Sequence, residues 1–527
     1  MKNLIESLHL LHDVANVVRV PQLVKGKVIA PPKVSKDAIE LAFQGKADDV
    51  THVTLADAQV LREPIIDRAS MQQTGEWQYQ VLARWEPLEL VEKDARELCS
   101  TLYALPFSEI ADYLDALGKH LAENQDVLDG VRELGRKTAP HPDRFHDASF
   151  DAFPIILGSD VASATVDAEL SWNGIPGRKF LDGWVDVDVD LFPGLTAMLA
   201  GELFGIEDLG RAKAALRAMP TRQLHITAGN APAIPVFSLL RAISTKGAAV
   251  IKSPYGAVMP GAVAALAAAS MAPDHPLTKH LSLVYWRGGD HAVEDVLLAP
   301  MAFDRIVVWG APEAVKSVQQ RAELTKTIAF NPRYGLSMIG KEAFRESSLR
   351  EIAIKASIDA LIWNQKACIA SFVQYVEGSM EDAERFAREL RQVISEWDAF
   401  APNHVPPQAA ASLRRMKRGK YMDARWHSAP SSNVVVMDGK FDMLDHPMAR
   451  TMIVRRVDRL EDVVETLHHG VASIGIYPEE RRKMLRDILL ARGVSNVLPL
   501  GQVERTFAGM PHDGMRVLGD LVDWKHA

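Results

Sequence analysis

Short apolar runs with β-rich composition alternate with helical stretches between residues 221 and 340. The expected strands are QLHITAG, AAVIKS, HLSLVYWRGG, RIVVWGA and TIAFN. The stretches between them have helical spacing: IPVFSLLRAIST, PGAVAALAAASMA, HAVEDVLLA and PEAVKSVQQRAEL. Strands and helices that take turns in this way predict βαβ units, with a parallel sheet covered by helices. Such sheets bind their ligands at the carboxyl ends of the strands.

A second α/β region follows. Residues 349–363 have helical spacing, residues 371–378 have the pattern of a strand, and residues 381–396 form an amphipathic, charge-rich pattern typical of a solvated helix. The later runs NVVVMD, TMIVRRV, VASIGIY and NVLPLG alternate with two more helical patterns. The sequence therefore predicts an α/β protein with two doubly wound domains. Its expected parts are an N-terminal extension (1–75), a first α/β domain (76–337), a second α/β domain (338–515) and a C-terminal tail (516–527).

The N-terminal third has weaker patterns. Residues 1–75 are expected to be irregular, and residues 76–145, beginning with WQYQVLARW, are expected to be helical, with Cys99 as a core thiol on an apolar helix side. GWVDVDVDLF predicts a strand that carries Asp186, Asp188 and Asp190 on one face. Three aligned carboxylates can bind a divalent cation, but a solvated edge strand is the favoured interpretation, and no metal site is predicted.

Composition limits the classes of function. The 527 residues carry a net charge of −8, which gives no electrostatic reason to expect nucleic acid or an anionic membrane as a partner. Two cysteines provide neither a disulfide framework nor the paired spacing of a zinc site, so a reducing cytoplasm is the expected location. The N-terminus is too interrupted by charge and histidine for a signal peptide. The uncharged stretch 253–273 predicts a buried helix starting at Pro260 rather than a membrane span, because prolines and glycines interrupt it.

Neither a G-x-G-x-x-G nor a G-x-x-x-x-G-K-[ST] motif is present, so a dinucleotide would bind without the usual glycine-rich turn. Three candidates for chemistry stand at the ends of expected elements. Cys368 follows a helix within Asn-Gln-Lys-Ala-Cys, and a cysteine thiolate attacks thioester and carbonyl carbons. Asn230 follows one strand, where its amide can stabilise an oxyanion. Lys252 ends the next strand, where it can hold ribose hydroxyls or a 2′-phosphate.

Simpler interpretations exist for each candidate. Cys368 can be an inert buried thiol, Asn230 a turn residue, and Lys252 an ordinary cation at a strand end. Gly310 is equally well explained as a plain turn between a strand and a helix. His512-Asp513 fits an acid/base pair or a loop turn, and the turn is favoured.

Together these segments resemble the aldehyde dehydrogenase superfamily, whose motifs occur in the same order and at similar separations over residues 220–520. The similar segments are Thr227-Ala228-Gly229-Asn230, Lys252-Ser253-Pro254, Val308-Trp309-Gly310-Ala311, Tyr334-Gly335-Leu336-Ser337 and Asn364–Cys368. The resemblance implies two doubly wound domains with a cofactor cleft between them: a dinucleotide-binding domain (76–337) and a catalytic domain (338–515) that carries the nucleophilic cysteine. It also implies Cys368 as nucleophile and Asn230 as oxyanion donor. It further implies cofactor binding by Thr227, Ala228, Gly229, Lys252, Ser253, Gly310 and Ala311.

Two departures from that superfamily are informative. Its hydrolytic members carry a water-activating glutamate before the Gly-Gly turn, where this chain has Phe330-Asn331-Pro332-Arg333. An enzyme without that base suits thioester exchange better than hydrolysis. The glutamate that binds both ribose hydroxyls of NAD is replaced by Tyr255, which removes a charge that repels a 2′-phosphate. NADPH is therefore the expected cofactor, with NADH as the alternative.

Within the superfamily the chain resembles most closely the acyl-CoA reductases of the bacterial bioluminescence type. The similar segments are HITAGNAP (225–232), GVSNVLPLG (493–501), GMPHDG (509–514) and a terminal LVDW (521–524). This resemblance implies reduction of an acyl-CoA or acyl-protein thioester to an aldehyde, a homo-oligomer and an acyl-transferring partner protein. An aldehyde dehydrogenase working oxidatively and a non-catalytic acyl-binding subunit remain the alternatives.

Overall fold

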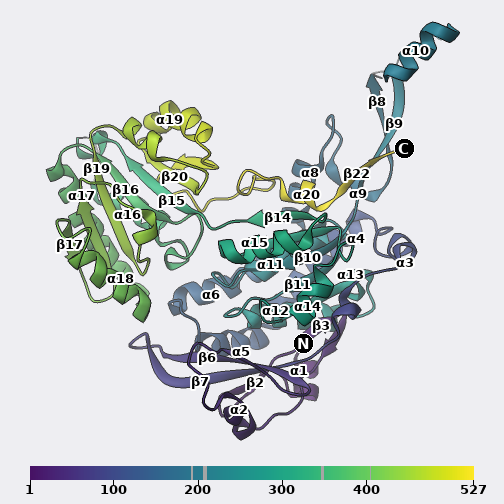
Figure 1. The fold of residues 1–527 in the computed structure, drawn as a ribbon, viewed down its shortest axis with the longest axis horizontal. Helices are drawn as coiled ribbons and strands as arrows, with labels where there is room; N and C mark the ends of the chain where they lie inside the picture. Colours follow the sequence, from purple (N-terminus) through teal and green to yellow (C-terminus); the bar gives the residue numbers. More distant parts are fainter. Residues whose placement is uncertain (191–193, 206–210, 346–348, 404) are drawn as a thin grey trace.

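A seven-stranded sheet organises the first α/β domain in the computed structural model, which describes the chain apart from residues 191–193, 206–210, 346–348 and 404 (Figure 1). Its order is β14-β13-β10-β11-β12-β3-β4, and the first five strands are parallel. The strands are β3 (Gln22–Val24), β4 (Lys27–Ile29), β10 (Arg222–Ile226), β11 (Ala248–Lys252), β12 (Leu281–Val284), β13 (Arg305–Trp309) and β14 (Lys326–Phe330). The predicted alternation of strands and helices in this region is confirmed.

Four helices connect the parallel strands, namely α11 (Ile234–Ser244), α12 (Val258–Met271), α14 (His291–Leu297) and α15 (Pro312–Ala322). Helix α12 is buried from Val258 to Ala268, with Pro260 in its first turn, where proline suits a helix. The predicted buried helix is confirmed and begins two residues earlier than expected. No helix in the described part of the chain is both long and apolar enough to cross a membrane.

The second α/β domain contains another seven-stranded sheet, with the order β17-β18-β19-β16-β15-β20-β21. All neighbours are parallel except β17 and β18. The strands are β15 (Tyr334–Ile339), β16 (Ser371–Glu377), β17 (Arg425–Ser428), β18 (Asn433–Met437), β19 (Thr451–Val457), β20 (Val471–Tyr477) and β21 (Asn496–Pro499). The main helices are α16 (Leu349–Leu361), α17 (Met380–Phe400), α18 (Pro407–Arg418) and α19 (Glu479–Ala491).

The N-terminal region differs from the prediction. Residues 1–83 contain a five-stranded sheet of order β1-β2-β7-β6-β5 rather than an irregular extension. These strands are β1 (Asp13–Val14), β2 (Val17–Arg19), β5 (His52–Thr54), β6 (Ala58–Asp67) and β7 (Gln72–Ala83), with α1 (Lys2–Leu8) and α2 (Lys36–Phe43) beside them. The segment expected to start a helix at residue 76 belongs to β7, because its pairing with β6 and β2 decides its conformation. The expected boundary at residue 75 therefore falls inside a strand.

Helices follow this sheet, as expected, and join the first domain. They are α3 (Ala95–Ser100), α4 (Phe107–Glu123), α5 (Gln125–Arg136), α6 (Asp143–Asp151), α7 (Phe153–Ile156), α8 (Ser159–Leu170) and α9 (Gly177–Asp182). Leu114 and Leu117 of α4 share one hydrophobic cluster with Val263 of α12, so this region packs into the first domain. The prediction that Cys99 is a core thiol is wrong, because Cys99 is exposed on the short helix α3.

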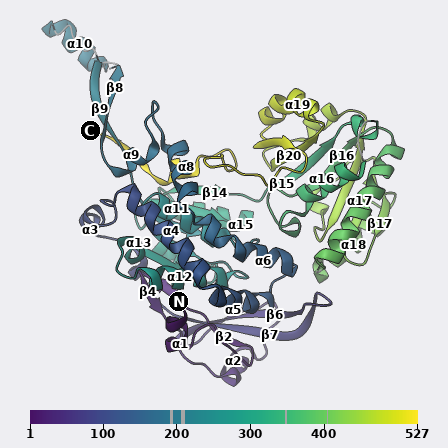
Figure 2. The ribbon, with the colours of Figure 1, turned by 180° about the vertical axis from the view of Figure 1, so that it is seen from behind.

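An arm projects from the first domain, as Figures 1 and 2 show. It consists of β8 (Val185–Asp190), β9 (Arg211–Met219) and the helix α10 (Leu195–Phe204) at its tip. The tail contributes α20 (Val517–Leu521) and β22 (Asp523–His526), which pairs with β9. β8 is the predicted edge strand, with Asp186 and Asp188 exposed and Val187 buried between them; the side chain of Asp190 lies outside the described part.

Candidate active site

Cys368 lies in the turn between α16 and β16, as predicted. The preceding residues form a short 3₁₀ segment, Ile362–Gln365, inside which the backbone turns left-handed. Trp363, Asn364 and Gln365 have φ of 50°, 54° and 68°. Each residue other than glycine in this conformation costs about 1–2 kcal/mol, so contacts elsewhere have to hold the segment.

Side chains of the same segment supply those contacts. Asn364 Oδ1 accepts a hydrogen bond from Arg450 Nε at 2.6 Å, and Asn364 Nδ2 donates to Asn403 Oδ1 at 2.7 Å. Gln365 Nε2 donates to the carbonyl of Thr451 at 2.8 Å, and Gln365 Oε1 accepts from the amide of Thr451 at 3.1 Å. The Asn-Gln pair therefore anchors the turn to the chain that enters β19.

The oxyanion candidate Asn230 reaches this turn from the first domain. Its side-chain Nδ2 donates to the carbonyl oxygen of Lys366 at 3.0 Å, across 136 residues of sequence. An amide nitrogen has two protons, so this bond leaves one N–H of Asn230 for a ligand. The structure thus brings Asn230 to the segment that carries Cys368.

The surroundings of Cys368 keep its thiol protonated. Burial raises the pKa of Cys368 to about 11, the charge of Asp513 adds to this, and Arg333 opposes it. Arg333 Nη1 lies 3.7 Å from Asp513 Oδ1 and donates to Ser495 Oγ at 2.6 Å. The thiolate is therefore a minor form at neutral pH in this arrangement.

We expect Asp513→Asn to speed the alkylation of Cys368 by iodoacetamide at pH 8 roughly threefold to tenfold. Removing the negative charge lowers the pKa of the thiol, so more thiolate is present at any pH below that pKa. Mass spectrometry of the two cysteines across a pH series measures this effect, with the exposed Cys99 as the internal reference. An alkylation rate equal to or below that of the wild type contradicts this account of the pKa.

His512 and Asp513 form a turn, as predicted, and the turn also lies at the site. His512 and Met515 pair as a two-residue hairpin, with Asp513 at φ 52° and Gly514 at φ 80°. The ring of His512 lies 5.1 Å from that of Trp309 and 4.7 Å from that of Phe330. The segment around His512 therefore packs against the carboxyl ends of β13 and β14.

The carboxyl ends of β13 and β14 carry stacked aromatic rings and no carboxylate. Trp309 and Phe330 stack with ring centres 3.8 Å apart and an angle of 15° between the rings. The guanidinium of Arg241 lies 5.5 Å from the centre of each of these rings. The sequence has no Asp or Glu between residues 324 and 341, so neither β14 nor β15 supplies a water-activating base.

Lys252 ends β11 as predicted and is buried beside two aromatic rings. Its Nζ lies 5.5 Å from the ring centre of Tyr285 and 5.3 Å from that of Trp286. Within the described residues it has no acidic side chain at ion-pair distance, and burial lowers its pKa to about 8. A buried cation without a partner at a strand end fits an anionic or hydroxyl-rich ligand, so these residues fit a pyridine dinucleotide.

The other predicted cofactor residues fall into two groups. Thr227 and Ser253 are buried; the hydroxyl of Thr227 donates to the carbonyl of Lys252 at 2.5 Å, so it ties β10 to β11. Gly229 and Ala311 are exposed, whereas Ala228 and Gly310 are half-buried. A Cβ on Gly229 would collide with the carbonyl oxygen of Tyr255, so glycine allows the two strand-end loops to approach each other.

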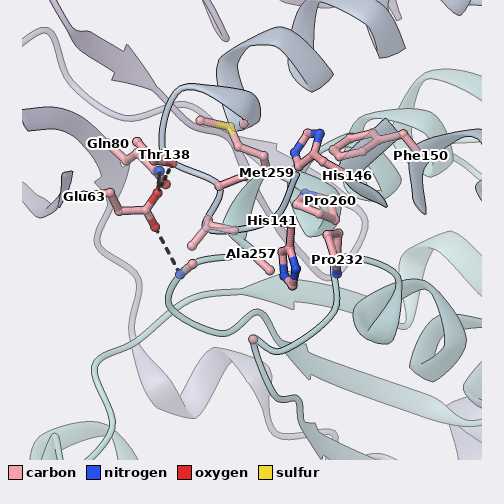
Figure 3. A pocket seen from close by; sticks show the side chains of 15 residues that line it. Glu63, Gln80, Thr138, His141, His146, Phe150, Pro232, Ala257, Met259 and Pro260 are labelled. Atoms are coloured by element: carbon pink, nitrogen blue, oxygen red, sulfur yellow. Dashed lines mark hydrogen bonds between the residues drawn. The ribbon is translucent and has the colours of Figure 1, made fainter. Parts of the chain in front are cut away.

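The N-terminal sheet supports the loop after Lys252, which the sequence did not indicate. Glu63 of β6 accepts hydrogen bonds from Thr138 Oγ1 at 2.6 Å, Gln80 Nε2 at 3.0 Å and the Gly256 amide at 3.1 Å (Figure 3). The hydroxyl of Tyr255 donates to the carbonyl of Arg62 at 3.0 Å. Burial raises the pKa of Glu63.

Two further side chains at the site were missed. His141 lies beside Pro232 in Figure 3, and burial together with the charge of Lys366 holds its pKa well below the usual value. Burial lowers the pKa of Lys366 to about 8, and its ammonium has no hydrogen-bond partner in the described part of the chain. Lys366 stands within the cysteine segment, so its position was a usable signal; no local pattern marks His141.

Solved structures share this fold over almost the whole chain. The NADP-dependent glyceraldehyde-3-phosphate dehydrogenase of Bacillus halodurans C-125, complexed with NADP, is 14% identical with a TM-score of 0.67, covering 97% of this chain and 98% of that one. The lactaldehyde dehydrogenase of Escherichia coli is 12% identical with a TM-score of 0.66, covering 97% and 99%. The fold is therefore that of the aldehyde dehydrogenases, as predicted.

The chain belongs to the family described as acyl-CoA reductase (LuxC), whose model matches residues 212–524. The long-chain acyl-protein thioester reductase of Vibrio harveyi is 26% identical over 324 residues, which are 60% of this chain and 66% of that protein. The long-chain acyl-protein thioester reductase 2 of Photobacterium leiognathi is 26% identical over 318 residues, or 59% and 64%. The similarity spans just under two thirds of the length of these relatives.

Proposed function

We propose that this protein reduces an acyl thioester, carried by CoA or by a protein, to the aldehyde with NADPH, through an acyl group on Cys368. One observation carries the proposal: the amide of Asn230 lies 3.0 Å from the carbonyl of Lys366, two residues before the cysteine. This bond joins the domain of Asn230, the proposed oxyanion donor, to the segment that carries Cys368, the proposed nucleophile. The family membership and the relatives named acyl-protein thioester reductase support the same conclusion.

The residues have the following proposed roles. The sulfur of Cys368, after losing its proton, attacks the thioester carbon, and the carrier thiol leaves. The second N–H of Asn230 donates to the oxygen that gains negative charge, as donors of oxyanion holes do. Bound NADPH would supply the hydride that adds to the carbonyl carbon of the acyl-cysteine; the bond between that carbon and the sulfur of Cys368 then breaks, which releases the aldehyde and the free thiolate. Because the ends of β14 and β15 lack a carboxylate base, water is not activated there to hydrolyse the acyl group.

Three observations support NADPH over NADH. Lys252 is buried without an acidic partner at ion-pair distance among the described residues, and position 255 has a tyrosine instead of an acid. Burial and then the charges of Arg287 and Lys252 lower the pKa of the neighbouring His52 to about 4. His52 is therefore neutral at pH 7, and the positive charges of Lys252 and Arg287 beside it suit a dianionic 2′-phosphate.

We expect Lys252→Met to raise both the KM for NADPH and the Kd for 2′,5′-ADP about 10- to 100-fold, because a charge-assisted hydrogen bond is lost while the apolar stem is kept. Isothermal titration with 2′,5′-ADP measures the affinity without turnover. Lys179→Met, at an exposed position on α9, is the matched control. An unchanged Kd for 2′,5′-ADP in Lys252→Met argues against Lys252 as a cofactor ligand.

The test of the function is a panel of acyl-CoA thioesters of different chain length, with NADPH oxidation, CoA release and aldehyde formation measured together. Intact-mass spectrometry without NADPH is expected to detect an acyl adduct on Cys368. If the protein reduces NADP with an aldehyde as substrate but does not oxidise NADPH with an acyl-CoA, the oxidative alternative is favoured. The raised pKa of Cys368 is the observation that favours a non-catalytic acyl-binding subunit. Alkylation of Cys368 no faster than that of Cys99, with no adduct, would support that alternative.

Self-association is part of the proposal. The helix α10 at the tip of the arm exposes a row of apolar side chains: Leu195, Met198, Leu199, Leu203 and Phe204. A row of exposed apolar side chains of this kind is typical of a protein–protein contact site. The arm is therefore proposed to contact a second copy of the chain, in keeping with the expected homo-oligomer. An acyl-transferring partner protein stays a prediction from the resemblance.

A further inference from the structure

Two segments with left-handed backbone contact each other just before Cys368. The first is residues 363–365, and the second is residues 448–450, where Met448, Ala449 and Arg450 have φ of 56°, 50° and 52°. Neither segment contains a glycine, which is the residue that adopts this conformation without strain. The side chains of Arg450 and Asn364 connect the two segments directly, and Gln365 bonds the backbone of Thr451, the residue just after the second segment.

Arg450 is the charged residue at the centre of this contact. Its side chain is fully buried. Nε donates to Asn364 Oδ1 at 2.6 Å, and Nη1 donates to Asp398 Oδ1 at 2.9 Å, while Nη2 has no partner within the described structure. A buried guanidinium is costly to desolvate, and replacement of a buried ion pair by apolar side chains is often neutral or stabilising. Stability alone therefore gives little reason for an arginine at this position.

We infer that Arg450 is a positioning residue for Cys368: through Asn364 it holds the left-handed turn that presents the thiol to Asn230. The inference rests on the proposed function, in which Cys368 accepts the acyl group. The guanidinium is planar and offers donors in a fixed fork, so one side chain bonds Asp398 and Asn364 at once. Asp398 is itself held by Arg391 Nη2 at 3.2 Å and by the hydroxyl of Ser432.

The conformation of residues 363–365 determines where the Lys366 carbonyl and the sulfur of Cys368 lie. Lys366 follows Gln365 immediately, and its carbonyl oxygen is the acceptor for Asn230 Nδ2. Release of Asn364 lets residues 363–365 return to the right-handed region, which moves both that carbonyl and the sulfur of Cys368. A displacement of about 1 Å at a reacting group can cost about 100-fold in rate. Arg450 thus acts without touching the substrate.

The experiment compares Arg450→Met, Arg450→Lys and Asn364→Gly with the wild type. Methionine removes both bonds of the guanidinium. Lysine keeps a positive charge for Asp398 but lacks the planar fork whose Nε and Nη1 donate to Asn364 and Asp398. Glycine at position 364 removes both side-chain bonds of Asn364, to Arg450 and to Asn403, allows either hand of backbone without strain and leaves the pair of Arg450 and Asp398 in place. Arg456→Met is the matched control, since Arg456 lies on β19 and bonds the carbonyl of Gly378.

Two readouts are taken from the same samples. The ratio of iodoacetamide alkylation at Cys368 to that at Cys99 is expected to rise roughly tenfold in all three variants, because a released turn exposes the thiol. The rate of acyl transfer from acyl-CoA to Cys368, followed by intact mass without NADPH, is expected to fall about 100-fold. The control is expected to leave both values unchanged.

A merely structural role of Arg450 predicts a different result. Arg450→Lys would then restore the alkylation ratio together with the Tm, and Asn364→Gly would match the wild type. An alkylation ratio within twofold of the wild type in Asn364→Gly overturns the inference, and this variant decides the question even if Arg450→Met does not fold. Absence of an acyl adduct in the wild type would contradict the proposed function, while the alkylation ratios would still test the positioning of the thiol.

Discussion

Replacing Cys368 by alanine is expected to lower the rate of aldehyde formation by at least about 10⁴-fold, as the loss of a catalytic nucleophile does in other enzymes. Alanine leaves the turn intact, because the anchoring bonds of the turn belong to Asn364 and Gln365. The measurement is NADPH oxidation with an active acyl-CoA, combined with the mass of the protein after incubation without NADPH. Both turnover and the acyl adduct should disappear.

Cys99→Ala is the control, because Cys99 is exposed on the short helix α3. It should retain both the activity and the adduct. Unchanged turnover in Cys368→Ala would exclude the covalent route. An adduct that persists in Cys368→Ala would place the acyl group on another side chain.

Replacing Asn230 by alanine is expected to slow acyl transfer to Cys368 about 10²- to 10³-fold, the usual effect of losing one oxyanion donor. The same change removes the hydrogen bond to the carbonyl of Lys366, so the two domains lose one of their contacts at the site. Single-turnover acylation without NADPH isolates this step. The Kd for 2′,5′-ADP should stay within about twofold, because Asn230 is not proposed to bind the cofactor phosphate.

Asn331→Ala is the matched control for Asn230, since Asn331 is an exposed asparagine just after β14. It should leave the acylation rate unchanged. A loss below about threefold in Asn230→Ala would mean that other donors hold the oxyanion. A large rise in the Kd for 2′,5′-ADP would instead assign Asn230 to the cofactor.

The thiol of Cys368 is poorly ionised in this arrangement, and this has a physical consequence for turnover. Its pKa of about 11 leaves little thiolate at neutral pH. A substrate or cofactor that shields Asp513, or that moves Arg333 closer to the sulfur, would lower that pKa. Comparison of Asp513→Asn with the wild type measures how much of the barrier to deprotonation comes from this one charge.

Most of the fold was predictable where strands are short, apolar and separated by helical patterns. The five parallel strands β10 to β14 lie as predicted. The inner strands β11, β12 and β13 are buried along nearly their whole length, which requires continuous apolar runs, whereas β14 at the sheet edge is only partly buried. The N-terminal sheet was not predictable in the same way. β7 contains TGEWQYQVLA, whose mixture of polar and apolar residues is compatible with either helix or strand until β6 and β2 pair with it. Cys99 is exposed although its helix has an apolar side, because the short helix α3 buries only Leu98.

The sequence by itself determined which side chains stand at the ends of elements: Asn230 and Lys252 after strands and Cys368 after a helix could be named from local patterns, because the end of an element is a local property. The tertiary structure alone decided what these side chains meet. The bond of Asn230 to Lys366 spans 136 residues, and the bond of Asn364 to Arg450 spans 86. The approach of Asp513 and of the N-terminal Glu63 likewise depends on how separate elements pack. Periodicity reports the burial of a segment against its nearest neighbours in sequence, whereas these contacts arise only after two domains and a returning tail have packed together.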